Sequence, residues 1–105
     1  MKHVRMLLES FGLGNRYIGF HYIVMAIELI MEDEARLQAV NKEIYAVIAD
    51  AYHCKYTSVE RSIRVAIGRA WTINEQAMKE MAPYPLLSKP TNAEFLELLS
   101  QYALK

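Results

Sequence analysis

The sequence predicts an all-α fold, a compact bundle of about six helices that contains a helix-turn-helix. Apolar residues recur three or four positions apart along most of the chain, the period of a helix with one buried face. No segment alternates apolar and polar residues over the length of a strand, and no internal repeat is present. With 105 residues, of which 53% are hydrophobic, the chain is long enough for one core and too short for two. We therefore expect a single domain over residues 1–105.

Two helices are expected in the N-terminal third. A short apolar stripe ends at Gly12, a residue that suits the position after a helix end. Asn15 is expected to cap a second helix over residues 16–32, which is apolar on almost every side and therefore belongs in the centre of the bundle. The acidic run 32–35 is either a further helical turn or a solvated link, and we prefer the link.

The helix-turn-helix is expected within residues 42–72. Asn41 is a plausible cap for its first helix, over residues 42–52. Only four residues separate that helix from Thr57, so the two helices should meet at a steep angle. The turn has no glycine, and His53 stands where a positive φ is expected, because histidine tolerates that region better than branched residues.

The second helix of the pair, residues 58–71, has one apolar side and one side that carries arginines. Thr57 and Glu60 form the pattern T-x-x-E, which predicts a capping box at its start. The residues expected to face the core are Val59, Ile63, Ala66, Ile67, Ala70 and Trp71. The residues on the other side are Ser58, Arg61, Arg64, Val65, Gly68 and Arg69. An exposed guanidinium is usually just a solvated charge, so the hypothesis of a DNA-reading helix depends on the turn and helix before it.

The C-terminal third is interrupted by prolines. After Trp71 the pattern weakens, and residues 72–81 are expected to be a fraying helix end or a short extra helix. Prolines at positions 83, 85 and 90 then exclude a continuous helix. Thr91 and Glu94 form a second T-x-x-E pattern, which predicts a capping box that opens the last helix.

Composition and charge limit the possible functions. Twelve lysines and arginines balance twelve aspartates and glutamates, so there is no overall attraction to nucleic acid. Residues 55–69 nevertheless carry four basic residues against Glu60 alone, which allows a local basic face. No apolar run reaches the about 20 residues of a membrane span, and the N-terminus lacks the apolar core of a signal peptide. The single cysteine, Cys54, suits a reducing compartment, so we expect a cytoplasmic protein without membrane contact.

The pattern of reactive side chains does not favour catalysis. Histidines and the cysteine do not occur at zinc-ligand spacing, and there is no phosphate-cradling glycine loop and no nucleophile with an adjacent base. We expect no metal, no cofactor and no enzymatic activity. His21 is interpreted as a hydrogen-bonded residue of the core or of its boundary, and Cys54 as a buried packing residue of the turn.

Two long motifs carry a resemblance to a known family. They are V-E-R-S-I-R-V-A-I-G-R-A-W over Val59–Trp71 and K-P-T-N-A-E-F over Lys89–Phe95, preceded by the glycine pair Gly12 and Gly19. The chain resembles the C-terminal effector domains of the stage zero sporulation A response regulators. The resemblance implies a six-helix domain that binds double-stranded promoter DNA as head-to-tail dimers and touches the sigma subunit of RNA polymerase.

The same resemblance implies a set of DNA contacts. Glu60 matches a base-contacting glutamate, Arg61 and Arg64 match arginines at the DNA face, and Lys89 matches a lysine near the backbone. By position on the helix, Arg61 lies opposite the core and is expected to read bases, whereas Arg64 lies beside Glu60 at the edge and is expected to grip phosphates.

The sequence also departs from the family. Ser58 replaces an arginine and Val65 replaces a histidine, so the sequence preference is expected to differ, and residues 71–89 are fewer than in the family, which bears on sigma contact. The chain is either a domain cut from a longer regulator or a stand-alone relative. The candidate DNA contacts are Ser58, Glu60, Arg61, Arg64, Val65 and Lys89. The alternative to a sequence-specific transcription regulator is a helical interaction module that kept the fold and lost specific DNA binding.

Overall fold

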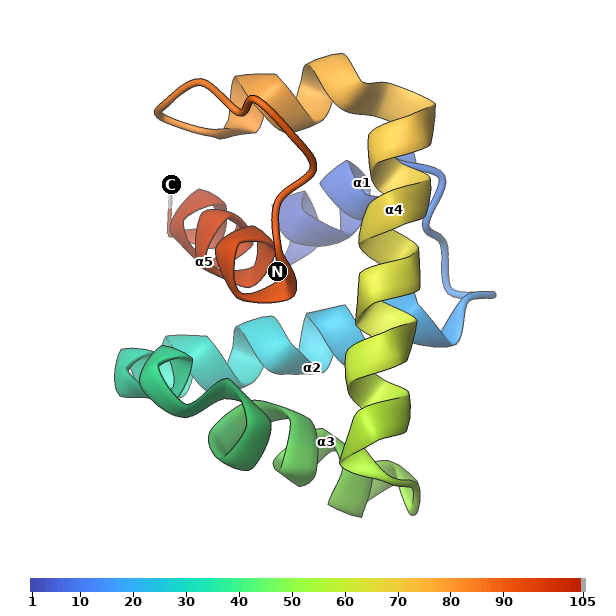
Figure 1. Ribbon diagram of the computed structural model, residues 1–105, viewed down its shortest axis with the longest axis vertical. Coiled ribbons are helices and arrows are strands. Elements are labelled where there is room, and N and C mark those ends of the chain that lie inside the picture. Colours follow the sequence, from blue (N-terminus) through green and yellow to red (C-terminus); the bar gives the residue numbers. More distant parts are fainter. Residues whose placement is uncertain (105) are drawn as a thin grey trace.

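Five α-helices and two short helical segments of other types make up the computed structural model, which describes residues 1–104 (Figure 1). In chain order they are α1 (Lys2–Ser10), α2 (Ile18–Glu32), the 3-10 segment η1 (Glu34–Ala39), the π-helical segment η2 (Asn41–Tyr45), α3 (Ala46–Tyr52), α4 (Tyr56–Met81) and α5 (Asn92–Ala103). None of the described residues forms a strand. The prediction of an all-α bundle of about six helices is confirmed.

The turn between α1 and α2 confirms one prediction and corrects another. Gly12 follows the end of α1 with a φ of +77°, the region that favours glycine. Asn15 is not the cap of α2, because the helix begins at Ile18 and Tyr17 precedes it without a side-chain capping bond. The backbone oxygen of Asn15 instead accepts a hydrogen bond of 2.8 Å from His21 Nε2, which confirms the hydrogen-bonded role expected for that histidine.

Helix α2 lies at the centre of the bundle, as its apolar character predicts. Nine of its fifteen residues are buried, and it packs against α4, α5, η1 and the remaining helical elements (Figure 1). It crosses α4 closely at Gly19, where a Cβ would lie 2.8 Å from the backbone oxygen of Ser62. The glycine therefore allows two helices to cross at a distance that any side chain would prevent.

The segment between α2 and α3 is helical, so the expected solvated link is wrong. Asp33 Oδ1 accepts a 3.0 Å hydrogen bond from the N–H of Ala35 and caps η1. The chain then continues through Val40, whose φ of −57° and ψ of −42° are helical, into η2 and α3. Asn41 is consequently inside a helical run and not at its start, because Asp33 has already supplied the cap.

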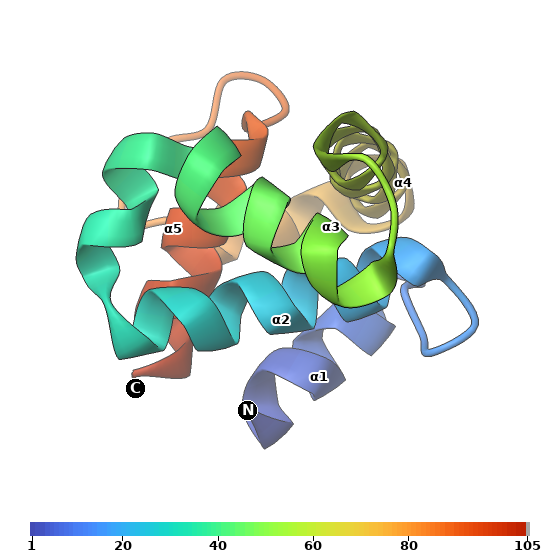
Figure 2. The ribbon, with the colours of Figure 1, turned by 90° about the horizontal axis from the view of Figure 1, so that it is seen from below.

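The connection between α3 and α4 is the turn of the helix-turn-helix. His53 has φ 56° and ψ 48°, as predicted, and the N–H groups of His53 and Cys54 donate to the oxygens of Asp50 and Ala49, the two bonds of a Schellman motif. In Figure 2 α4 is seen nearly end-on with α3 running across its base. Cys54 is exposed and not buried as expected; it is the buried Tyr22 that packs at this turn, with its hydroxyl 3.7 Å from Cys54 Sγ.

Helix α4 begins earlier than the capping pattern predicts. It starts at Tyr56 after Lys55, whose backbone is extended, and no side chain caps it. Thr57 therefore lies inside the helix, and the predicted capping box with Glu60 does not form. The pattern T-x-x-E at Thr91 does form both bonds, with Thr91 Oγ1 accepting from Glu94 N at 3.2 Å and Glu94 Oε1 accepting from Thr91 N at 3.0 Å.

The C-terminal part of α4 is the short extra helix that was one of the two expectations for residues 72–81. Asn74 has non-helical backbone angles, and its side chain accepts a 3.1 Å hydrogen bond from Ala77 N, which restarts the helix after the bend. Figure 1 shows this part turning across the top of the bundle. Met78 from it is fully buried.

The apolar stripe of α4 enters the core, except at its end. Val59, Ile63, Ala66, Ile67 and Ala70 are buried in one continuous hydrophobic cluster, as predicted. Trp71 is only partly buried, and the ammonium of Lys79 lies 5.8 Å from its ring centroid. Replacing Trp71 by alanine should therefore cost less than the about 3 to 5 kcal/mol of a fully buried tryptophan.

Candidate nucleic-acid interface

The exposed face of α4 consists of two lines of side chains that border different grooves. We call the first line the α2-side flank; its members are Ser58, Arg61, Val65 and Arg69, spaced by three or four residues, and they border the start of α2. We call the second the α5-side flank; its members are Glu60, Arg64 and, from the segment before α5, Lys89. The six candidate DNA contacts are thus distributed three and three over the two flanks.

The groove beside the α2-side flank has a volume of about 600 Å³ and no acidic side chain in its lining. Leu13, Ile18 and Gly19 form the wall opposite α4. Arg61 borders this groove, is exposed, and has no hydrogen-bond or ion-pair partner among residues 1–104. Its guanidinium is therefore available to an external anion or base edge.

Arg69, at the end of the same flank, is held by the protein. Its Nε donates to the backbone oxygen of Gly12 at 3.2 Å, and its guanidinium lies 4.8 Å from the centroid of the Tyr17 ring. These two contacts attach the turn between α1 and α2 to α4. Of the two arginines on this flank, Arg61 is thus the one without an internal role.

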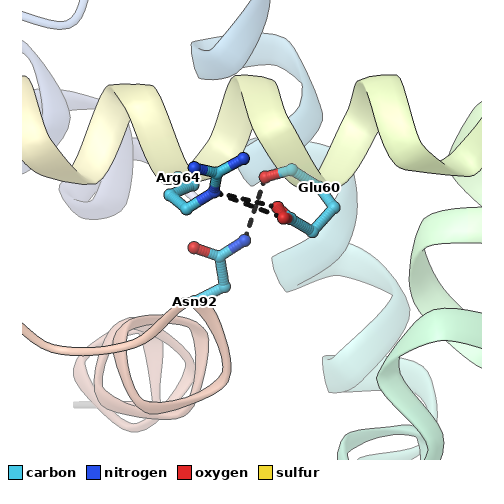
Figure 3. A network of polar contacts seen from close by, with 3 residues as sticks. All are labelled: Glu60, Arg64 and Asn92. Carbon is cyan, nitrogen blue, oxygen red and sulfur yellow. Dashed lines mark hydrogen bonds and ion pairs between the residues drawn. The ribbon is translucent and has the colours of Figure 1, made fainter.

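The α5-side flank is organised by internal contacts. Arg64 Nε lies 3.2 Å from Glu60 Oε2, an ion pair one helical turn apart, as its expected position beside Glu60 predicts (Figure 3). Asn92, at the start of α5, donates from Nδ2 to the backbone oxygen of Glu60 at 3.0 Å. Arg64 therefore pairs with the side chain of Glu60, and Asn92 hydrogen-bonds to its backbone.

Lys89 reaches the same flank from the segment before α5. Its Nζ lies 3.6 Å from the point that a Cβ on Gly68 would occupy, a distance of ordinary van der Waals contact, so the lysine lies over α4. Tyr45 borders the groove beside the α5-side flank as well. The pKa of its phenol is raised above its ordinary value, mainly by burial and also by the carboxylate of Glu60, while the Asn92 side chain acts in the opposite direction. Tyr45 is thus neutral at physiological pH.

Sequence reasoning missed Asn92 as a part of this site. The motif K-P-T-N contains this asparagine, but the sequence does not reveal its role. Its partner is the backbone oxygen of Glu60, which any residue type at that position would supply. The apolar wall contributed by Ile18 was missed for the same reason: the crossing of α2 over α4 at Gly19 is a long-range contact.

The described chain offers neither a metal site nor a membrane-spanning helix. Among residues 1–104 no three histidine, cysteine, aspartate or glutamate side chains are grouped so that they could hold a metal ion. None of the helices in this part combines the length and the apolar character needed to cross a membrane.

A helical domain that presents an arginine-bearing helix after a left-handed turn is of the helix-turn-helix class. The family model described as "Sporulation initiation factor Spo0A C terminal" matches residues 4–103 of the chain. The chain therefore belongs to this family, which consists of DNA-binding regulatory domains of sporulation and not of enzymes. The resemblance inferred from the two motifs is confirmed, and DNA is the partner that the family implies.

Proposed function

We propose that this domain is a sequence-specific, DNA-binding transcription regulator that places the N-terminal part of α4, about residues 58–71, in the major groove. The observation that carries the proposal is Arg61, an exposed arginine with no partner among residues 1–104, on a flank whose groove lacks acidic side chains. Such a guanidinium loses no internal contact when it binds guanine or phosphate.

The six candidate residues take different roles in this proposal. Arg61 reads a base, and Glu60 accepts from the amino group of a cytosine when it leaves its ion pair. Arg64 and Lys89 contact phosphates, which position the domain without reading sequence. Ser58 is too short to replace the arginine of the family and contacts the backbone or a near base edge.

The assembly on DNA is also a proposal. Head-to-tail dimers on tandem promoter sites and contact with the RNA polymerase sigma subunit follow from the family resemblance. Because the segment 71–89 is shorter than in the family, we expect the sigma contact to be altered or lost. A cytoplasmic location remains our prediction, which the single cysteine favours.

The second candidate function is an interaction module without specific DNA binding. The ion pair of Glu60 with Arg64 favours it, because it engages two of the candidate contacts internally. The zero net charge favours it as well, since it removes long-range attraction to DNA.

Binding to duplexes selected from a random pool separates the two functions. Fluorescence anisotropy should show tighter binding to the selected duplex than to a scrambled one. Affinity should also fall linearly with salt on logarithmic axes, with a slope of about 0.9 for each phosphate contact. As a control, Arg5→Ala removes one positive charge from α1, outside the proposed interface. It should leave both the sequence preference and the affinity for DNA nearly unchanged. Absence of binding even at low salt would favour the interaction module.

A further inference from the structure

We propose that Val65 recognises the 5-methyl group of thymine, at a position one or two base pairs from the base that Arg61 contacts. The proposal rests on the proposed function, because it requires α4 to lie in the major groove. It adds a base preference that the arginines and Glu60 do not supply.

Val65 is not a residue of the hydrophobic core. Its side chain is 61% exposed on a helix, where a β-branched residue is less favourable than leucine, lysine or glutamate. A single exposed apolar residue is ordinary, but Ile18, 47% exposed, lies on the opposite wall of the same groove. An apolar strip therefore borders the unpaired Arg61.

The position of Val65 on α4 fits a base contact. Val65 follows Arg61 by one helical turn, and both border the groove beside the α2-side flank. One turn rises about 5.4 Å, whereas successive bases of a strand lie about 3.4 Å apart, so the two side chains reach bases one or two steps apart.

The chemistry of the side chain leaves one complementary partner. Valine offers methyl groups and no hydrogen bond. Among the major-groove edges, thymine alone presents a methyl group, beside its O4 acceptor. Guanine, adenine and cytosine present donors and acceptors, and a valine would displace their bound water without offering a hydrogen bond in return. Contact with valine therefore favours thymine over the other three bases.

The test replaces each thymine of the selected duplex, one at a time, by deoxyuridine, which lacks only the methyl group. At one position the wild-type domain should bind the deoxyuridine duplex about fourfold more weakly, the effect of leaving one methyl group unburied. Val65→Ser should bind the two duplexes equally at that position. Because Val65 is exposed, this variant should keep the fold, which circular dichroism checks.

Met31→Ser is the matched control, since it removes another exposed apolar side chain, 46% exposed, from the end of α2 farthest from α4 (Figure 1). It should keep the fourfold ratio. If the wild type binds its selected duplex with no deoxyuridine effect at any position, or if Val65→Ser keeps the ratio, the methyl recognition is refuted while DNA binding stands. If the wild type binds no duplex, both proposals fail.

Discussion

The two flanks of α4 carry arginines of the same type in different states. On the α2-side flank Arg61 has no partner among residues 1–104 and its neighbour Val65 is largely exposed. On the α5-side flank Arg64 is paired with Glu60, and Asn92 holds the backbone of that glutamate. We propose a corresponding division of work, in which Arg61 and Val65 on the α2-side flank contact bases, and Arg64 and Lys89 on the α5-side flank contact phosphates at the groove edge. Glu60, which lies between them, reads a base only when it leaves its ion pair.

The energetics are compatible with that division. The ion pair of Glu60 with Arg64 is a partly exposed pair one helical turn apart, a type worth about 0.3 to 0.5 kcal/mol. A phosphate can therefore take Arg64 from Glu60 at small cost. Arg61 has no such contact to give up, so only its desolvation and the ordering of its side chain offset its interaction with a base.

The largest expected effect concerns the crossing that builds the α2-side groove. Gly19→Ala would place a Cβ 2.8 Å from the backbone oxygen of Ser62 and 3.0 Å from Ala66 Cβ, neither of which can move without shifting α4. We expect a loss of stability of about 1 to 3 kcal/mol, measured by urea denaturation. An unchanged midpoint would show that the helices do not cross this closely.

A smaller effect is expected on the α5-side flank. Asn92→Ala removes the donor to the Glu60 oxygen and should lower the stability by about 0.5 to 1.5 kcal/mol, the value of one hydrogen bond. Asn41→Ala is the control, because Asn41 is an exposed asparagine that borders the same groove and should change the stability by less than about 0.5 kcal/mol. Equal effects of the two variants would remove Asn92 from the account of this flank.

The smallest effect should be a stabilisation. Gly68 lies in a helix, and a Cβ there would be in ordinary contact with Lys89 Nζ at 3.6 Å. Gly68→Ala should therefore raise the stability by about 0.5 to 1 kcal/mol through helix propensity, opposite in sign to Gly19→Ala. A destabilised variant in thermal melts would mean that Lys89 lies closer to α4 than the structure places it.

The features that sequence predicts well here are local. The positive φ at His53 and the capping box at Thr91 depend on residues within a few positions, and both are present. The identical pattern at Thr57 fails because α4 starts two residues earlier, at Tyr56 after the extended backbone of Lys55. The pattern T-x-x-E contains no information about where the preceding chain enters the helix. A local pattern can therefore indicate that a helix begins nearby, but it does not determine the first residue of the helix.

The features that sequence missed depend on contacts between distant segments. Periodicity assigned Trp71 to the core face but could not predict that its side chain is only partly buried, because burial depends on the segments that pack around it. Asn92 and the oxygen of Glu60 meet only because α5 docks beside α4. The residue types at the candidate site were therefore predictable from the motifs, while their division into two flanks required the structure.

Selection of binding sites from a random duplex pool, repeated with Arg61→Ala and Arg64→Ala, tests the division of the flanks most directly. Arg61→Ala should cost about 1 to 3 kcal/mol on the preferred site and relax the preference at one position. Arg64→Ala should weaken all sequences alike and lower the salt slope by about one. If Arg61→Ala instead keeps the wild-type preference with uniform weakening while Arg64→Ala loses it, the roles of the two flanks are reversed and the proposed placement of α4 in the groove is wrong.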